Sequence, residues 1–256
     1  MAMPTRYGEL KPAELTRLIR DVGVAVLPIG SLEWHGNHLP YGVAGFLAED
    51  FAERLAERVR AVLLPTLYAP MTTLPDKHSL CVRSEVFRGI IFDHLNGLKS
   101  AGFRTVCIVT GHCAQGHLVE LYEAATAFIG AELYVIAASP LEVIEDDSLL
   151  DHGGRWETAQ MLSLKPELVD LSALPERLTP KSSGILGEDP RCAKAEEAKN
   201  LTDRALDVWV NWVEQPDIRA IERFYVRRIK SFSEYLETYA ALSWEQAIRA
   251  WWEKKD

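Results

Sequence analysis

The sequence predicts an α/β protein: a three-layer αβα sandwich with a mostly parallel central sheet, followed by a helical extension. Three observations support this fold class. Short apolar runs rich in Val, Ile and Leu alternate with longer stretches that have helical periodicity. The links between these segments are short, as in parallel sheets whose strands are joined by helices. The apolar runs are continuous, which is typical of strands buried on both faces.

Each element follows from its local pattern. The expected strands are the apolar runs at residues 22–27, 61–64, 105–109 and 133–138. Helices are expected where apolar residues recur three or four positions apart, at residues 11–20, 46–59, 85–100, 118–129, 155–164 and 191–213, with two more within 217–256. The remaining stretches are expected to be irregular, at residues 68–84, 110–116, 140–154 and 168–187.

The domain organisation is expected to be simple, because the sequence contains no internal repeat and no flexible linker. We expect one domain over residues 1–256. Its core would cover about residues 1–213, and a helical, aromatic-rich extension about residues 214–256.

The composition of the 256-residue chain excludes several classes of protein. With 48% hydrophobic and 25% charged residues it is ordinary for a globular protein. A net charge of −9 and the lack of a long Lys/Arg cluster argue against binding to nucleic acid. The four cysteines form no CxxC pair, the first ten residues lack the apolar segment of a signal peptide, and no apolar run is long enough to span a membrane. We therefore expect a cytoplasmic protein that acts on a small molecule.

Groups that can bind a metal are concentrated in residues 27–42, directly after the first expected strand. Glu33 and His35 are two residues apart, Trp34 lies between them, and His38 follows three residues later. The same stretch holds three glycines and two prolines, which favour backbone conformations outside regular structure. This density of functional groups predicts part of an active site.

Two further clusters follow later strands of the expected sheet. His112 comes after the third strand, and His152 and Glu157 come after the fourth. Since ligands bind at the carboxyl ends of parallel strands, all three clusters are expected to meet at one edge of the sheet.

Carboxylate and imidazole together are the ligand set for zinc, manganese or iron. A catalytic metal needs about three protein ligands and one open position. Glu33, His35 and His112 meet that count, Glu157 could be a fourth ligand, and His152 could act as a general acid or base. Taken singly, each residue also has a plainer interpretation: a Glu-x-His pair is common in polar loops, and His112 could be a hydrogen-bonded turn residue.

Four segments resemble the creatininase family of metal-dependent amidohydrolases. Residues 27–40, Leu-Pro-Ile-Gly-Ser-Leu-Glu-Trp-His-Gly-Asn-His-Leu-Pro, are similar to the family signature Pro-x-Gly-Ser-x-Glu-x-His-Gly-x-His-Leu-Pro. Residues 110–112 resemble its Asn-Gly-His turn, and residues 152–158 its His-Ala-Gly-Glu-x-Glu-Thr-Ser segment. Residues 184–193 resemble a later Gly-x-x-Gly-Asp-Pro motif. The order of the four segments is the family's, and the resemblance covers about the first 200 residues.

The resemblance implies an αβα sandwich, commonly assembled as a hexamer, that hydrolyses cyclic amides or related rings with a metal-activated water. It implies that Glu33, His35 and His112 are metal ligands. It also implies that His152 transfers a proton and that Glu157 supports the site.

Two positions depart from the family pattern. Ala44 stands where the family has a metal-bridging aspartate, and Ala114 stands where creatininase has a ligand glutamate. Because alanine cannot bind a metal, we expect one Zn, Mn or Fe ion per subunit instead of two.

Other differences fall where substrate would approach. Residues 80–84 replace the family's Phe-Pro-Gly-Thr-Ile, and Arg155 replaces a glutamate. Cationic Arg83 and Arg155 would favour an anionic or polyhydroxy substrate. The residues that we expect to contact the substrate are Trp34, His38, Arg83, Arg155 and Trp156.

Three hypotheses of function stay open on the sequence. The first is a metal-dependent hydrolase of a small cyclic amide. The second keeps the fold but opens a cyclic ketone or diketone, as some creatininase-like proteins do in sugar or inositol catabolism. The third, supported by Ala44, is a relative that has lost catalysis and binds a small molecule or serves as an assembly partner.

Overall fold

A computed structural model describes residues 4–130, 133–232, 237–238 and 240–254 of the chain. Its strands are β1 (Thr5–Arg6), β2 (Val24–Gly30), β3 (Val62–Leu63), β4 (Leu67–Tyr68), β5 (Thr105–Thr110) and β6 (Tyr134–Ala138). The sheet order is β1-β3-β2-β5-β6, with β4 also pairing with β2, and every pairing is parallel. The predicted α/β class with a mostly parallel sheet is confirmed.

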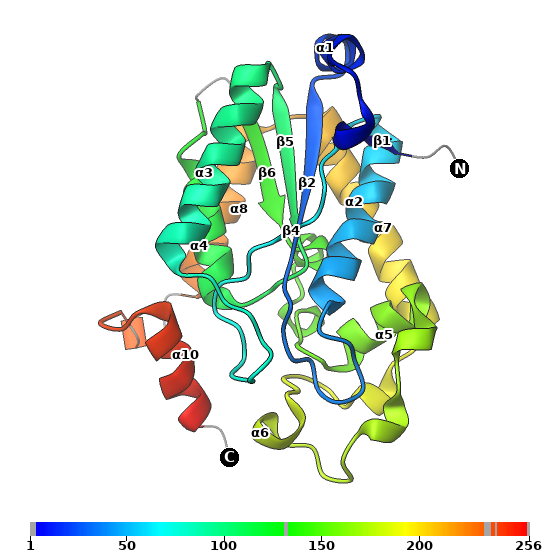
Figure 1. Cartoon of the computed structure of the whole chain (residues 1–256), viewed down its shortest axis with the longest axis vertical. Helices are drawn as coiled ribbons and strands as arrows, with labels where there is room; N and C mark the ends of the chain where they lie inside the picture. Colours follow the sequence, from blue (N-terminus) through cyan, green and yellow to red (C-terminus); the bar gives the residue numbers. More distant parts are fainter. Residues whose placement is uncertain (1–3, 131–132, 233–236, 239, 255–256) are drawn as a thin grey trace.

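The helices cover both faces of this sheet. They are α1 (Pro12–Asp21), α2 (Val43–Val59), α3 (Ser84–Ala101), α4 (Gln115–Thr126), α5 (Arg155–Leu164), α6 (Pro180–Ser183), α7 (Ala195–Glu214), α8 (Ile218–Ser231) and α10 (Trp244–Glu253). Short 3-10 turns occur at Tyr7–Glu9, Pro140–Ile144, Asp147–Leu149, Pro166–Leu168, Leu171–Ala173 and Pro190–Cys192. In Figure 1, α2 and α7 lie on one side of the strands and α3, α4 and α8 on the other. The three layers of the predicted sandwich are therefore present.

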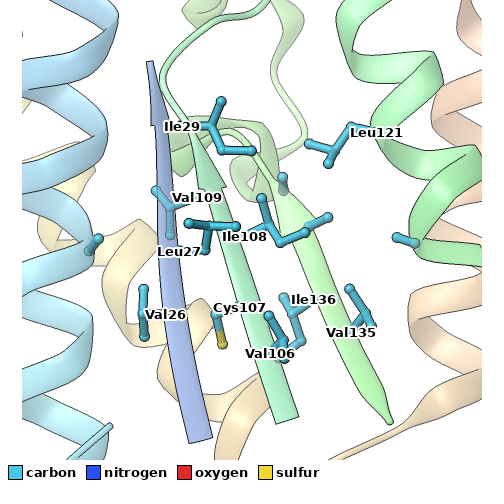
Figure 2. Packing of buried hydrophobic residues seen from close by; sticks show 14 of the residues in the cluster. Val26, Leu27, Ile29, Val106, Cys107, Ile108, Val109, Leu121, Val135 and Ile136 are labelled. Carbon is cyan, nitrogen blue, oxygen red and sulfur yellow. The ribbon is translucent and has the colours of Figure 1, made fainter. Parts of the chain in front are cut away.

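The core lies in the middle of the sheet. All residues of β2 and β5 are buried, and their register pairs Val26 with Cys107 and Leu27 with Ile108. Figure 2 shows these side chains packed between the strands and the flanking helices. The continuous apolar runs arise because helices cover both faces, so that neither face needs polar residues.

The edge strand β6 is covered by α8. The Tyr225 hydroxyl accepts a hydrogen bond from Ala137 N at 2.8 Å and donates one to Val135 O at 2.9 Å. These bonds satisfy backbone groups that an exposed edge would leave open to another strand. The segment after residue 213 thus contributes to the closure of the sheet.

The boundaries differ from the sequence prediction in a few places. The four expected strands and the expected helices are present, with ends shifted by a few residues. Within the range 217–256, for which two helices were expected, residues 233–236, 239 and 255–256 lie outside the described residues. The two-residue strands β1 and β4 were not predicted, and the loop expected at 168–187 contains α6. None of the helices among the described residues has the length and apolar character needed to cross a bilayer.

Candidate metal centre

The carboxyl ends of β2, β5 and β6 point toward the end of the molecule where α5, α6 and α10 lie (Figure 1). At the end of β2, Gly30 lets the chain pass close to α2. A Cβ atom on Gly30 would lie 2.3 Å from the Cα of Gly45, so the two backbones are in direct contact. Gly36 follows with a φ of +83°, which favours glycine. This tight geometry fixes the turn that carries Glu33 and His35.

The Glu33 carboxylate is held from both sides. One oxygen, Oε1, accepts a hydrogen bond from Leu74 N at 2.6 Å, and Oε2 lies 3.0 Å from His112 Nδ1 and 3.4 Å from Ser31 Oγ. Only 2% of the residue is exposed. Burial alone would raise the pKa of Glu33, but the charge and the hydrogen bond of His112 help to outweigh it, so the pKa is lowered. Glu33 is therefore an anion at neutral pH.

His35 and His152 are arranged alike. His35 Nδ1 lies 2.8 Å from the carbonyl oxygen of Glu33, and His152 Nε2 lies 2.8 Å from that of Trp34. A carbonyl oxygen only accepts, so these nitrogens carry hydrogen, and His35 Nε2 and His152 Nδ1 keep their lone pairs. The rings stack with centroids 4.1 Å apart. Metal-binding histidines are commonly oriented in this way by a backbone carbonyl.

His35 is held in the form that binds metals. Burial, followed by the charge of His152, lowers the pKa of His35 to about 3. The ring is thus neutral at physiological pH. One atom each of Glu33, His35 and His152 lie within 4.8 Å of one another. Ligands of one Zn²⁺ are separated by at most about 4.2 Å, so small rotations would bring these three onto a single ion. The donor set therefore fits one divalent metal.

His112, expected from sequence to be a ligand, lies outside that group of three. Its Nδ1 faces Glu33 Oε2 at 3.0 Å, and its Nε2 faces the Met71 carbonyl oxygen at 2.9 Å. Burial would lower the pKa of His112, but the charge and hydrogen bond of Glu33 raise it above its usual value. Both nitrogens thus act as donors in this arrangement, and His112 holds the Glu33 carboxylate in place.

Glu157 lies at the start of α5 and faces the same space. Its Oε2 accepts a hydrogen bond from Gly153 N at 2.6 Å and lies 3.6 Å from His35 Nε2. Burial, and then the charge of Asp151, raise the pKa of Glu157 well above its usual range. The carboxyl is thus suited to hold a proton close to the predicted ligands.

Asp151 is a site residue that the sequence did not reveal. Its carboxylate accepts hydrogen bonds from Trp156 N at 2.8 Å and Glu157 N at 3.1 Å, so it caps α5. Burial raises the pKa of Asp151 to about 7, although those hydrogen bonds oppose the shift. Two features of the sequence could have pointed to Asp151. It directly precedes His152, and it lies five residues before Trp156, at the start of an expected helix.

Two expected substrate contacts are packed beneath the site. The Trp34 ring lies against Gly184, where a Cβ atom would come within 2.9 Å of it. His38 is 1% exposed, and its Nε2 lies 3.0 Å from Thr158 Oγ1. These positions stabilise the loops that carry the site.

The other expected contacts lie at the surface or in ion pairs. Arg155 pairs with Glu188 at 2.9 Å and Glu197 at 2.5 Å, and its guanidinium lies 4.5 Å from the centre of the Trp156 ring. The side chain of Arg83 is 77% exposed. Two carboxylates therefore already neutralise Arg155.

A cavity of ≈ 290 Å³ opens on the donor group. Glu33, His112, Asp151, His152 and Glu157 line one part of it. The described residues that line this cavity include none of the five expected substrate contacts. Those contacts are Trp34, His38, Arg83, Arg155 and Trp156. Their role in substrate binding stays a prediction.

The two alanines that depart from the family pattern have different surroundings. Ala114 lines the cavity. Ala44 is fully buried, and a Cβ atom on Gly111 would lie 2.0 Å from its carbonyl oxygen. Neither side chain offers a ligand, and the number of metal ions per subunit stays a prediction.

Comparison with known proteins gives relatives for both sequence and fold. A creatininase model, described as creatinine amidohydrolase, matches residues 8–213. The chain is 28% identical to creatinine amidohydrolase of Pseudomonas putida over 205 residues, covering 67% of this chain and 76% of that protein. It is 21% identical to 3-dehydro-scyllo-inosose hydrolase of Thermotoga maritima over 170 residues, covering 61% of this chain and 55% of that protein.

Solved structures share the fold. A crystal structure of creatinine amidohydrolase (creatininase) matches with a TM-score of 0.69 and 22% identity, covering 84% of this chain and 99% of that chain. A manganese form of creatininase matches with a TM-score of 0.68, and a variant described as the Zn-Zn type with 0.69; both are 22% identical and cover 84% of this chain and 100% of theirs. Since the family model covers well over half of the chain, this protein is a hydrolase of the creatininase family.

Proposed function

We propose that this protein is a metal-dependent amidohydrolase that opens a small cyclic amide, with one Zn²⁺, Mn²⁺ or Fe²⁺ per subunit. The observation that carries the proposal is the group of Glu33, His35 and His152, in which two imidazoles present lone pairs beside one carboxylate. Relatives described with manganese and zinc support the choice of metals.

The geometry favours His152 over His112 as the third ligand, because both nitrogens of His112 face oxygen acceptors. His112 would then orient Glu33. When bound, the metal would polarise the amide carbonyl and lower the pKa of a nearby water molecule.

Glu157 is the group best suited to move the proton. Hydrolysis adds water to the carbonyl carbon, breaks the C–N bond and delivers a proton to the leaving nitrogen. Burial and Asp151 raise the pKa of Glu157, which makes its carboxylate a stronger base toward water, and the proton that it takes can then pass to the leaving nitrogen. Asp151 holds Glu157 in place through the start of α5.

A second candidate function is hydrolysis of a carbon–carbon bond in a cyclic ketone. It is favoured by the similarity to 3-dehydro-scyllo-inosose hydrolase, and it would use the same metal and the same proton carrier. The third hypothesis, a relative without catalysis, rests on Ala44. The retained donor group weighs against it.

The proposal also includes a single domain over the whole chain, a homohexamer and a location in the cytoplasm. The hexamer follows from the family resemblance, the single domain from the lack of an internal repeat or flexible linker, and the location from four cysteines without a CxxC pair. Native mass spectrometry would check the hexamer, and fractionation would check the location.

The test of function is a substrate screen with metal-loaded protein. Creatinine and hydantoin would represent cyclic amides, and cyclohexane-1,3-dione would represent cyclic diketones. We expect ring opening of at least one amide, with a loss of roughly 100-fold or more in kcat/KM in His152→Ala. Turnover of the diketone alone would favour the second candidate, and no turnover of any ring would favour the third.

A further inference from the structure

One side of the cavity is built by the chain segment that the family model does not cover. That model ends at residue 213. Phe232, directly after α8, and Ile248 and Trp251 on α10 all line the same cavity as Glu33 and His152. This side of the cavity is therefore formed by residues that lie beyond the family model.

α10 is held near the site and presents one face to it. Ile248 and Trp251 are three residues apart, so they share a side of the helix. Trp252 is not among the residues that line this cavity. It lines a second pocket next to Arg83, to which Ile248 also contributes. Lys181 Nζ in α6 donates a hydrogen bond to the carbonyl oxygen of Glu253 at 3.2 Å, which ties the end of α10 to the loop region below the sheet. Figure 1 shows α6 and α10 at this same end of the molecule.

This side of the cavity is apolar. Phe232 is only 8% exposed, and Ile248 and Trp251 are partly buried. Leu150 and Leu186 continue the apolar surface toward the donor group. A ring substituent that filled this space would exchange water for alkyl and aromatic contacts, which is favourable in proportion to the apolar area buried.

The cation in this part of the cavity is already neutralised. Arg228 also lines it, but its Nε donates to Glu142 Oε1 at 2.7 Å and its Nη1 to Asp147 Oδ1 at 2.7 Å. Its guanidinium lies 5.0 Å from the centre of the Phe232 ring. Its Nη2 has no hydrogen-bond partner among the described residues. The two carboxylates around this one guanidinium nevertheless give the wall no net positive charge to attract an anionic substituent.

We propose that Phe232, Ile248 and Trp251 form a subsite for an uncharged alkyl or aryl substituent on the substrate ring. The proposal rests on the function proposed above in one respect, namely that a cyclic amide occupies the adjoining space. It names the class of substrate: a cyclic amide with an apolar side group, in place of the anionic or polyhydroxy class that Arg83 and Arg155 suggested.

The experiment measures binding, so it does not depend on turnover. Dissociation constants of hydantoin, 5-benzylhydantoin and hydantoin-5-acetate would be measured by calorimetry for metal-loaded wild type, Trp251→Ala, Ile248→Ala and Trp252→Ala. Trp252→Ala is the matched control, with the same residue type in the same helix but outside the cavity. Thermal melts would show that each variant is folded.

We expect 5-benzylhydantoin to bind wild type about tenfold more tightly than hydantoin, and hydantoin-5-acetate to bind no better than hydantoin. Trp251→Ala and Ile248→Ala should each reduce the benzyl advantage several-fold, while Trp252→Ala keeps it. A preference for the acetate, an equal loss in Trp252→Ala, or no binding of any probe would overturn the proposal. Binding of 5-benzylhydantoin through Trp251 without ring opening would leave the subsite standing and count against the amidohydrolase. Turnover of hydantoin without tighter binding of 5-benzylhydantoin would support the amidohydrolase and overturn the subsite.

Discussion

At the residue scale, the three histidines of the site differ in the hydrogen bonds of their two ring nitrogens. His35 and His152 each donate one N–H to a backbone carbonyl, and the other ring nitrogen keeps its lone pair. His112 faces a carboxylate and a carbonyl, so it donates twice. In the proposed metal centre, identical residue types would therefore act as ligand or as positioning group, according to the acceptors next to each ring.

Replacement of Glu157 tests its role in proton transfer. Glu157→Gln keeps the shape and the bond from Gly153 N but cannot exchange a proton, so kcat should fall about 10²–10⁴-fold. Metal content, measured in parallel, should stay near that of wild type. Glu123→Gln, a surface change on α4, is the control and should keep kcat. A Glu157→Gln protein with at least half of the wild-type kcat would rule out this role.

His38 should make the folded protein sensitive to acid. Burial lowers the pKa of His38 to about 4, whereas an unfolded histidine has a pKa of about 6.5. Between these values the unfolded chain binds more protons, so the free energy of unfolding falls as pH drops from about 6.5 to 4.

The measurement is urea unfolding at several pH values in this window. In His38→Asn the loss of stability across the window should be smaller by on the order of 2 kcal/mol. His78→Asn, at an exposed histidine, should behave as wild type. An unchanged pH dependence in His38→Asn would contradict this explanation.

At the scale of the elements, the site depends on close contact between β2 and the start of α2. Gly30→Ala would place a Cβ atom 2.3 Å from the Cα of Gly45, and backbone cannot move aside as a flexible side chain can. We expect a loss of about 2 kcal/mol in the free energy of unfolding, together with weaker metal binding. In Gly89→Ala, a Cβ atom meets nothing within 4 Å inside α3, and stability should stay equal or rise. Equal stability of both variants would show that the contact has no structural importance.

The sequence predicted those elements whose residues carry a strong local pattern. The strands β2, β5 and β6 were predictable because strands buried on both faces are continuously apolar. The strand β3 was predicted because it lies in the apolar run at residues 61–64. The equally short β1 and β4 lie in no such run, and their pairing depends on partners distant in sequence. The expected parallel topology placed Glu33 and Glu157 at one edge of the sheet, and in the structure both lie close to His35 there.

Other features of the site depend on three-dimensional contacts that no local pattern encodes. His112 forms hydrogen bonds with Glu33 and with the Met71 carbonyl oxygen, and both partners are distant from it in sequence. Asp151 acts through backbone groups of α5. The cavity wall formed by Ile248 and Trp251 follows from how α10 lies beside the site.

At the scale of the whole molecule, segments distant in sequence converge on one cavity. The loop after β2 supplies Glu33, and the turn after β5 supplies His112. The start of α5 supplies Glu157, and the extension supplies Trp251. Because the predicted ligands come together only in the folded chain, a bound metal should stabilise the fold as well as the site.

The most direct test of the account is the metal content of each subunit after reloading and gel filtration, measured by elemental analysis for wild type, His152→Ala and His112→Ala. We expect about one Zn²⁺ or Mn²⁺ per subunit in wild type. The metal content should fall strongly in His152→Ala and less in His112→Ala. A wild-type content below about 0.3 per subunit would contradict the proposed metal centre, since a three-ligand site should retain its ion through the column.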